Sequence, residues 1–343
     1  MKKLSFFNRI VFYLNVIVAV ALLVACIVPY TDSASLAFLS LSVPLLVLVN
    51  ALFVVFWVVK RNIRALFSIS VLVYGYMNMG PFFQFGNDIN PIDEKKALSL
   101  MSYNSLGFRW KDDVWGSTAG VSIVKFINKE NPDFISFHEF DDRKMGKDYF
   151  NKYPYSFIDH ELGEPQSGVL QAIFSKYPII NSGVLDFPDS SNSAIFSDIV
   201  YGKDTLRIYN LHLQSLSIRP RSIKRERSYR LFARLRRSFR RQLNQSEIVR
   251  AHVNSGPFKS IVSGDFNNNQ FSRVYFNLRG DFKDSFLEKG TGFGTTINFW
   301  RFSFRIDYVL VDPSFEVVSH QNYDINLSDH EPIMASIKIA SDE

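Results

Sequence analysis

Hydrophobic and polar positions divide the chain into two parts. Residues 10–30 and 36–59 carry no charged side chain, and residues 65–85 form a third apolar stretch that glycine, asparagine and proline dilute. Each of the first two stretches is long enough to cross a hydrocarbon core of about 30 Å as a helix. The first lacks the following cleavage site of small residues that a signal peptide has. We therefore expect residues 1–86 to form a transmembrane anchor of two to three helices.

Short apolar segments alternate with polar loops from about residue 97 onward. The segments that have the pattern of strands are ALSLMSYN, DFISFHEF, GVLQAIFSK, AIFSDIVYG, TLRIYNLHLQ, FKSIVSGDFN, RIDYVLV and IMASIKI. STAGVSIVKFINKE instead has apolar residues at helical spacing. Several strands follow one another around short turns, as antiparallel pairs do. We expect residues 87–343 to form one α/β (α+β) domain of two packed sheets with helices outside.

Basic residues beside the apolar stretches predict the orientation of the anchor. They lie before the first stretch and between the second and third: Lys2, Lys3, Arg9, Lys60, Arg61 and Arg64. Cytoplasmic loops carry the excess of Lys and Arg. Three crossings then place the domain on the outer, periplasmic side of an inner or plasma membrane, and two crossings leave it in the cytoplasm. We favour three crossings.

A strongly basic segment interrupts the folded part. Residues 219–241 hold eleven Lys or Arg and one acid, a net charge of +10 in a chain whose total is +6. Its apolar residues recur at helical spacing: Leu231, Phe232, Leu235, Phe239 and Leu243. Such a helix suits an anionic membrane surface or a polyanion such as nucleic acid, or it is a solvated helix with one face on the core. We favour the membrane, because the chain is anchored there.

Polar side chains recur where the predicted strands begin or end. These are Asn104, Glu139, Asn210, His212, Asp265, Asn267, Asp307, Asp329 and His330. Buried charges are costly unless they are paired or bound to a metal, so converging carboxylates imply a cation. Oxygen ligands without cysteine favour Mg²⁺, Mn²⁺ or Ca²⁺ over zinc. The chain also lacks the histidine pair with a neighbouring glutamate that marks many zinc hydrolases.

Six short motifs occur in a fixed order: YN, HEF, NLHL, GDFN, RIDYVLV and SDHEPI. Together they resemble the endonuclease/exonuclease/phosphatase superfamily of metal-dependent phosphoesterases over about residues 97–340. The resemblance implies a four-layer sandwich of two mixed β-sheets flanked by helices. It also implies a Mg²⁺-dependent phosphoester hydrolase, with Mn²⁺ as the alternative ion. Its substrates would be phosphodiesters or phosphomonoesters in nucleic acids, lipid headgroups or inositol phosphates.

The same resemblance assigns roles by matched position. The metal residues are Glu139, Asn104 and Asp329, and the catalytic residues are Asp265, Asn267, His330, Asp307 and His212. Asn210 and Asn104 contact phosphate or support the site. Where many members have a glutamine before the metal-binding glutamate, this chain has His138.

The chemistry of phosphoester hydrolysis accounts for these residue types independently. The reaction needs charge neutralised on phosphate oxygens, a water in line with the leaving oxygen and a group that handles protons. Asp265 is one candidate base, with Asn267 directing the water, and the His330–Asp307 pair is the other. The sequence leaves this choice open.

Ordinary interpretations stand beside the functional ones. His212 and His330 can be core histidines, Asp307 can pair with Arg305 or Arg301, and Glu139 can be a solvated loop carboxylate. The aromatic segment before Asp307, TINFWRFSF, is either an apolar rim for lipid or a strand facing the core, and we favour the core. The alternative function is a non-catalytic, membrane-anchored module that binds anionic ligands through the same fold.

Overall fold

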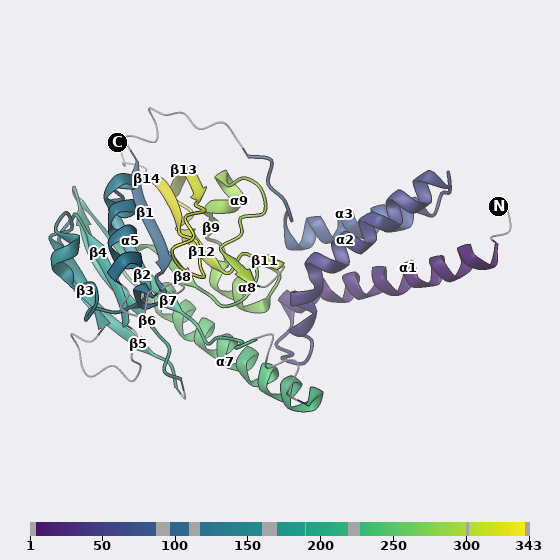
Figure 1. The fold of residues 1–343 in the computed structure, drawn as a ribbon, viewed down its shortest axis with the longest axis horizontal. Coiled ribbons are helices and arrows are strands. Elements are labelled where there is room, and N and C mark those ends of the chain that lie inside the picture. Colours follow the sequence, from purple (N-terminus) through teal and green to yellow (C-terminus); the bar gives the residue numbers. More distant parts are fainter. Residues whose placement is uncertain are drawn as a thin grey trace.

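The fold is a layered domain from which three helices extend as a rod (Figure 1). The computed structural model describes residues 5–86, 97–109, 117–159, 170–188, 190–218, 227–299 and 302–339. The predicted strands and the predicted helix over residues 117–130 are present. The first helix, α1 (Phe6–Ala25), begins at the far end of the rod (Figure 1).

The first sheet has six strands in the order β13-β14-β1-β2-β4-β3. Their bounds are β1 Leu98–Asn104, β2 Phe134–Phe140, β3 Tyr155–Ile158, β4 Leu170–Ser175, β13 Phe315–Asn322 and β14 Ile333–Ile339. β1 and β2 pair in parallel, whereas the other neighbours pair antiparallel. The sheet is therefore mixed.

The second sheet also has six strands, in the order β5-β6-β7-β8-β12-β9. Their bounds are β5 Ile179–Asp186, β6 Ser193–Tyr201, β7 Asp204–His212, β8 Lys259–Asp265, β9 Lys283–Asp284 and β12 Asp307–Val311. β7 and β8 run parallel, and the other pairs are antiparallel. This sheet is mixed as well.

Alternate residues of each strand face the other sheet or a helix, as the period of two requires. The inner faces meet in one apolar core that includes Leu100, Phe134, Ile208 and Ile261. On the outer faces, α5 (Ser117–Glu130) covers the first sheet, and α7 (Ser228–Ser255) with α8 (Arg273–Arg279) covers the second. The shorter segments are η2 Leu106–Phe108, η3 Lys147–Phe150 and α9 Ser285–Lys289. The expected four-layer sandwich is confirmed.

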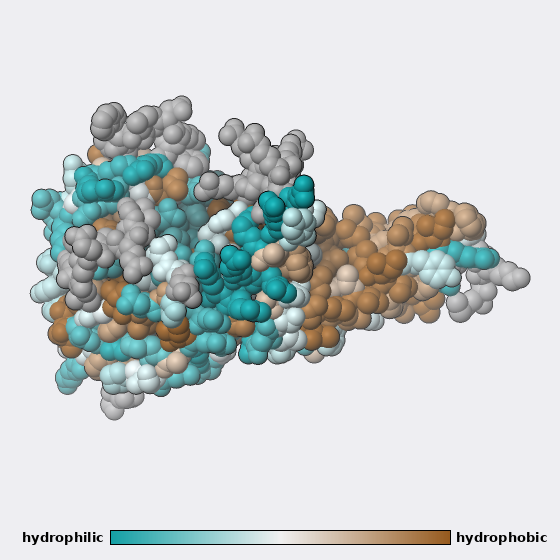
Figure 2. Space-filling model, turned by 90° about the horizontal axis from the view of Figure 1, so that it is seen from below, coloured by the Kyte–Doolittle hydropathy of each residue, from teal (hydrophilic) through white to brown (hydrophobic). Residues whose placement is uncertain are grey.

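The N-terminal helices are α1 (Phe6–Ala25), α2 (Phe38–Val59) and α3 (Ala65–Met79), with the short turn η1 (Val28–Tyr30). Within the described residues, α1 with its extension to Tyr30 and α2 are long and apolar enough to span a membrane, and α3 is shorter. The surface of the rod is mostly hydrophobic (Figure 2). A hydrogen-bonded chain ties all three helices together inside it. Trp57 Nε1 donates to Asn15 Oδ1 at 3.0 Å, and Asn15 Nδ2 donates to Ser68 Oγ at 2.7 Å.

The loop after β8 joins the domain to the rod. Asn269 Nδ2 donates to Ser40 O at 2.8 Å, and Gln270 Nε2 donates to Pro81 O at 2.8 Å. Phe271 is buried in the same apolar cluster as residues of α1, α2 and α3. The segment that follows Asp265 is thus built into the base of the rod.

Our interpretation of the aromatic segment before Asp307 as a strand facing the core is wrong. Residues 297–304 form a separate hairpin of β10 (Ile297–Phe299) and β11 (Phe302–Phe304) that belongs to neither six-stranded sheet. Phe304 is half-buried and lines a cavity against α2. Apolar alternation predicts a buried face but does not say which surface covers it. Trp300 and Arg301 lie outside the described residues.

The basic segment forms a helix from Ser228 onward, and residues 219–226 lie outside the described part of the chain. Leu235 and Phe239 are buried. Phe38, at the start of α2, stacks on Phe232 with ring centroids 4.6 Å apart. The apolar face of this half of α7 therefore packs against the base of the rod, while Arg236, Arg237 and Arg240 are exposed.

Candidate active site

Strand register brings the predicted residues to one edge of the sandwich. In the second sheet, Asp265 lies between His212 of the parallel neighbour β7 and Asp307 of the antiparallel neighbour β12. In the first sheet, β1 ends at Asn104, directly opposite His138 of β2. The side chain of Asn104 reaches across to Asp265, so these strand ends of the two sheets lie together.

The Asp265 carboxylate is the centre of the cluster and is 1% exposed. Its Oδ2 lies 3.2 Å from Asn104 Nδ2, 3.7 Å from His330 Nε2 and 3.9 Å from His212 Nε2. Oδ1 accepts a hydrogen bond of 2.8 Å from the backbone N–H of Asn267. Burial raises the pKa of Asp265 to about 6, although the charge of His330 acts to lower it. Such a carboxyl group can exchange protons near neutral pH.

His330 is held by Asp307, with Nδ1 and Oδ2 2.9 Å apart. Thr296 Oγ1 accepts the backbone N–H of Asp307 at 3.2 Å and so fixes the start of β12. Burial lowers the pKa of His330, but the carboxylates of Asp307 and Asp265 outweigh burial and raise this pKa to about 10. The ring is therefore cationic at neutral pH, with its Nε2–H side toward Asp265.

Glu139 reaches the cluster through an irregularity in β2. The register between β2 and β4 shifts between Phe137 and Phe140, and Glu139 has a φ of +49°. Such bulges re-aim side chains next to active sites. Glu139 Oε1 lies 3.3 Å from Asn104 Nδ2 and 3.8 Å from His212 Nε2. Burial raises the pKa of Glu139, whereas the Asn104 hydrogen bond lowers it.

His212 is a half-buried ring at the rim shared by Glu139 and Asp265. Burial lowers the pKa of His212 even though Asp265 acts to raise it. At neutral pH this imidazole is therefore uncharged, in contrast to that of His330. The two histidines can take different parts in one reaction.

A close approach of β7 and β8 supports these two strand ends. Gly264 has a φ of +150°, and a Cβ atom there would lie 2.2 Å from the carbonyl oxygen of Leu211. A side chain at this position would push the strands apart beside His212 and Asp265. Glycine is therefore required directly before the catalytic candidate.

Asn267 lies in the turn after Asp265, with a left-handed φ of +50°. Asparagine tolerates this conformation better than most residues. Its Nδ2 donates to Leu213 O at 3.0 Å, and its carbonyl oxygen accepts from Gln242 Nε2 at 3.0 Å. Gln242 lies on α7, so the large helix holds this turn in place.

Asn210 lies deeper than the other candidates, between the sheets. Its Nδ2 donates to Phe137 O at 2.7 Å and to Ala172 O at 3.3 Å, which links β7 to β2 and β4. The neighbouring His138 is fully buried, and burial lowers the pKa of His138 to about 3. In the structure, the Asn210 amide thus holds the strand that ends at His212.

Asp329 lies at the outer edge of the site and is exposed. Its charge contributes to raising the pKa of Glu139. The preceding Ser328 is buried and donates from Oγ to Asn104 O at 2.8 Å, while the backbone N–H of His330 donates to the same Oγ at 3.3 Å. Ser328 therefore fixes the loop of Asp329 and His330 to the end of β1.

The donor set fits a divalent cation. Asp265, Asp307 and His330 offer ligand atoms within 4.8 Å of one another. Asp307 and His330 already bind each other, however, whereas the carboxylates of Glu139 and Asp265 converge on the Asn104 amide. With Asp329 at the outer edge, the site has four carboxylates and one cationic ring, that of His330. This excess of negative charge, with oxygen donors, suits Mg²⁺ or Mn²⁺.

Some supporting residues were missed in the sequence. Thr296 and Gln242 belong to none of the six motifs, and tertiary packing brings them to Asp307 and Asn267. Ser328 was within reach, since it is the first residue of the SDHEPI motif. Arg305, weighed as a partner of Asp307, instead pairs with Asp284 at 2.8 Å.

Comparisons with known proteins agree with this geometry. Residues 101–330 match a family model described as Endonuclease/Exonuclease/phosphatase family, and residues 8–82 match a domain of unknown function. A search of curated proteins finds no match to the chain.

Solved structures resemble the fold at low sequence identity. D. rerio TDP2 in complex with a single-strand DNA product has 14% identity and a TM-score of 0.54, over 71% of this chain and 99% of that one. A mannosyl-6-phosphatase of Bacteroides thetaiotaomicron has 17% identity and a TM-score of 0.53, over 71% and 100%. The human Nocturnin catalytic domain with bound sulfate has 16% identity and a TM-score of 0.53, over 71% and 94%.

Proposed function

The chain belongs to the endonuclease/exonuclease/phosphatase family, and on that premise we propose that it is a membrane-anchored, divalent-metal-dependent phosphoesterase. The observation that carries the proposal is the meeting of Asp265, His330, Asp307 and Glu139 at one edge of the two sheets. Phosphoester hydrolysis is the established chemistry of this fold family. One structural neighbour is complexed with a DNA product and another is named a mannosyl-6-phosphatase, so the fold is compatible with both phosphodiesters and phosphomonoesters.

Asp265 and His330 have different roles in hydrolysis at the phosphorus atom. Asp265, whose pKa of about 6 lies near neutrality, accepts a proton from the attacking water, and the turn at Asn267 fixes the direction of this carboxylate. A positioned base of this kind contributes about 10²- to 10⁴-fold to the rate. His330, held by Asp307 as an imidazolium, hydrogen-bonds a phosphate oxygen. We favour Asp265 as the base because a ring already protonated at pH 7 is unable to accept a proton.

A divalent ion would be held by Glu139, with Asn104 and Asp329 as direct or water-mediated contacts and Asp265 beside it. Such an ion supplies Lewis-acid stabilisation of the charge on the phosphate oxygens. His212 and Asn210 complete the assignment. His212 faces the same rim as a phosphate contact, and Asn210 supports the strand on which His212 lies.

The helical rod supports anchoring in a membrane. Few side chains of α1 and α2 are buried inside the molecule: the buried share of their apolar stretches is only 28% and 17%. A soluble protein rarely exposes so large an apolar patch. α2 has 22 residues, which span about 33 Å as a helix. That length matches a hydrocarbon core of about 30 Å.

The basic residues at the end of the rod away from the folded domain support the proposed side. Lys60, Arg61 and Arg64 lie in the turn between α2 and α3. Arg64 lies over the ring of Phe12, 5.0 Å from its centroid, so this turn and the start of α1 are at the same end. The folded domain is at the other end (Figure 1). The positive-inside rule then puts the domain on the outer, periplasmic side of the inner membrane.

The helix α7 supports a second contact with the membrane. Its apolar residues pack against the base of the rod, where α2 would leave the bilayer. Arg236, Arg237 and Arg240 remain exposed there. Each basic side chain close to an anionic surface contributes about 1 kcal/mol. The same charge would serve a nucleic acid substrate, but the position beside the rod favours lipid headgroups.

One experiment tests the proposal against the non-catalytic alternative. The full chain in detergent is given bis-p-nitrophenyl phosphate or p-nitrophenyl phosphate, with Mg²⁺, Mn²⁺ or EDTA. We expect metal-dependent release of p-nitrophenol that EDTA abolishes, and the better substrate decides between diester and monoester. Absence of turnover with every ion, together with tight binding of anions, would establish the alternative instead.

A further inference from the structure

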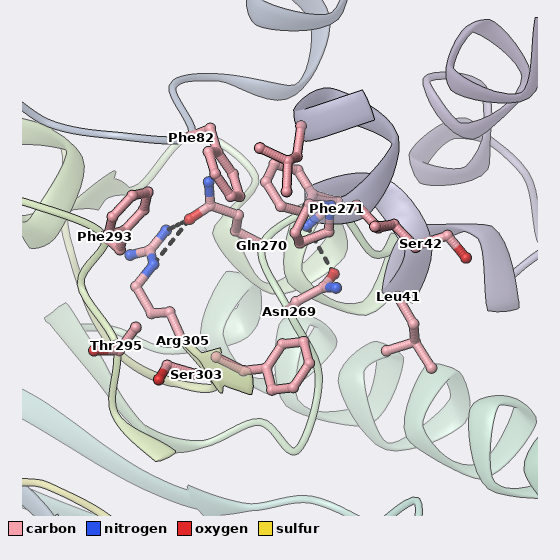
Figure 3. A pocket seen from close by; sticks show the side chains of 14 residues that line it. Leu41, Ser42, Phe82, Asn269, Gln270, Phe271, Phe293, Thr295, Ser303 and Arg305 are labelled. Atoms are coloured by element: carbon pink, nitrogen blue, oxygen red, sulfur yellow. Dashed lines mark hydrogen bonds between the residues drawn. The ribbon is translucent and has the colours of Figure 1, made fainter. Parts of the chain in front are cut away.

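A cavity of about 640 Å³ lies between the rod and the folded domain (Figure 3). α2 forms one wall, the loop after β8 forms the floor, and β11 with Thr295 forms the opposite wall. Its volume is that of a small-molecule binding pocket, which is typically about 300–1,000 Å³. None of the catalytic candidates lines it, so it is a separate feature of the molecule.

The walls of this cavity are suited to a hydrocarbon chain. α2 contributes Leu41, Leu45 and Leu48, and Phe82 and Phe293 close the other side (Figure 3). The charge of the lining residue Arg305 is already matched, because its guanidinium pairs with Asp284 at 2.8 Å and donates to Gln270 Oε1 at 2.9 Å. An anionic ligand would find no uncompensated charge at Arg305.

The cavity opens onto the surface that we assign to the bilayer. Leu45 and Leu48 line it and are also 59% and 55% exposed on α2. α2, on which they lie, is part of the rod, whose visible surface is mostly hydrophobic (Figure 2). A lipid beside α2 therefore meets the cavity without crossing a polar barrier at these two side chains.

Two walls of the cavity lead directly to the candidate active site. Asn269, in the floor, is two residues from Asn267, and consecutive Cα atoms are about 3.8 Å apart. Thr295 lines the cavity just before β10 and precedes Thr296, whose Oγ1 accepts the backbone N–H of Asp307. The hairpin also pairs with the catalytic loop, through a bridge between Ile297 and His330.

We propose that the cavity holds an acyl chain of a membrane lipid whose phosphoester is hydrolysed at Asp265 and His330. This inference rests on the proposed function and narrows its substrate class to lipid phosphoesters. Drawing a lipid phosphate out of the headgroup layer exposes chain methylenes to water, at about 0.8 kcal/mol each. That cost equals about a fourfold loss in rate for each exposed methylene, and the cavity removes it by keeping the chain covered.

The test compares two synthetic diesters with the same leaving group, hexadecyl p-nitrophenyl phosphate and methyl p-nitrophenyl phosphate. The full chain is placed in phosphatidylcholine nanodiscs with Mg²⁺. Ser42→Trp fills the cavity from α2, and Ser70→Trp is the matched control on the exposed surface of α3. We expect the wild type and Ser70→Trp to prefer the hexadecyl ester. In Ser42→Trp, hydrolysis of this ester should fall at least about tenfold while that of the methyl ester is unchanged.

The outcomes separate the inference from the function on which it rests. A wild type that hydrolyses both esters equally, or a preference that survives in Ser42→Trp, overturns the acyl-chain site. Cleavage of plasmid DNA that Ser42→Trp leaves intact, without a preference for the hexadecyl ester, assigns the enzyme to nucleic acid. A wild type that cleaves neither ester nor DNA contradicts the phosphoesterase itself.

Discussion

His330 Nδ1 and Asp307 Oδ2 lie 2.9 Å apart, although 23 positions separate the two residues in the chain. The pair joins the start of β12 to the loop before β14, and it faces Asp265. The carboxylate of Asp307 is one of the three charges, with those of Asp265 and Asp329, that raise the pKa of His330 to about 10. The proposed charge of this ring at neutral pH depends on that contact.

Replacing Asp307 by asparagine should lower the pKa of His330 from about 10 toward the ordinary value of about 6.5. The ring then loses its charge at pH 8, and we expect kcat to fall about a hundredfold or more. An NMR titration of histidine ring protons in EDTA measures the pKa of His330 directly. Asp312→Asn, in the turn between β12 and β13, is the control. An unchanged His330 titration in Asp307→Asn contradicts the proposed pairing.

Mg²⁺ should raise the melting temperature of the wild type, because a ligand that binds only the folded state stabilises it. At a concentration of a hundred times Kd, the gain is about 2.7 kcal/mol. Glu139→Gln should lose most of this shift, since the proposed ligand is gone. Glu316→Gln, on an exposed position of β13, should keep it. Equal shifts of the melting temperature in both variants would show that Glu139 does not bind the ion.

The buried His320 should make the fold sensitive to acid. Its Nδ1 lies 2.8 Å from Ser285 Oγ, and burial lowers the pKa of His320 to about 4, with Asp284 raising it and Arg305 lowering it further. The unfolded chain takes up this proton near pH 6.5 and the folded chain only near pH 4, so stability falls as the pH drops through that window. Between pH 7 and pH 5 the loss is about 2 kcal/mol.

Chemical denaturation of the wild type and His320→Asn at the two pH values measures this effect. The variant lacks the titrating ring. The change in its free energy of unfolding between pH 7 and pH 5 should therefore be smaller than that of the wild type by the same amount. Parallel pH dependence in the two proteins would show that His320 takes up its proton normally in the folded state.

The layers of the fold and the main strand ends could be predicted from the sequence alone. β1 ends at Asn104 and α5 covers residues 117–130 as expected, because buried strands and amphipathic helices have distinct periods. Asp265, His330 and Asp307 could be chosen as candidates because their motifs follow a recognisable order, and the structure brings their side chains together.

Other features depend on contacts that a local pattern does not contain. The left-handed φ of Glu139 arises from a register shift against β4, and nothing in the letters SFHEF indicates it. The sequence interpretation placed the segment of β10 and β11 as a strand facing the core. Its aromatic residues do not reveal that the surface facing β11 belongs to α2. The cavity exists only where two separately predicted parts of the chain meet.

The orientation of the anchor can be tested with single cysteines in a Cys26→Ala background. Ser33→Cys lies in the loop between α1 and α2, and Asn62→Cys lies in the turn between α2 and α3. With the domain outside, an impermeant maleimide added to intact spheroplasts should label Ser33→Cys and spare Asn62→Cys. Both should react after lysis. Labelling of Asn62→Cys alone in intact cells would show that the orientation is the opposite of the proposed one.

The central claim is that Asp265 works with the acids and imidazoles around it to break a phosphoester bond. Its most direct measurement is the Mg²⁺-dependent hydrolysis of bis-p-nitrophenyl phosphate by Asp265→Asn, with the melting temperature recorded in parallel. The amide keeps the shape of the side chain but accepts no proton from water. We predict a loss of at least about a hundredfold in kcat in a protein that remains folded, while Asp312→Asn retains wild-type turnover. Wild-type turnover by a folded Asp265→Asn variant would contradict the claim.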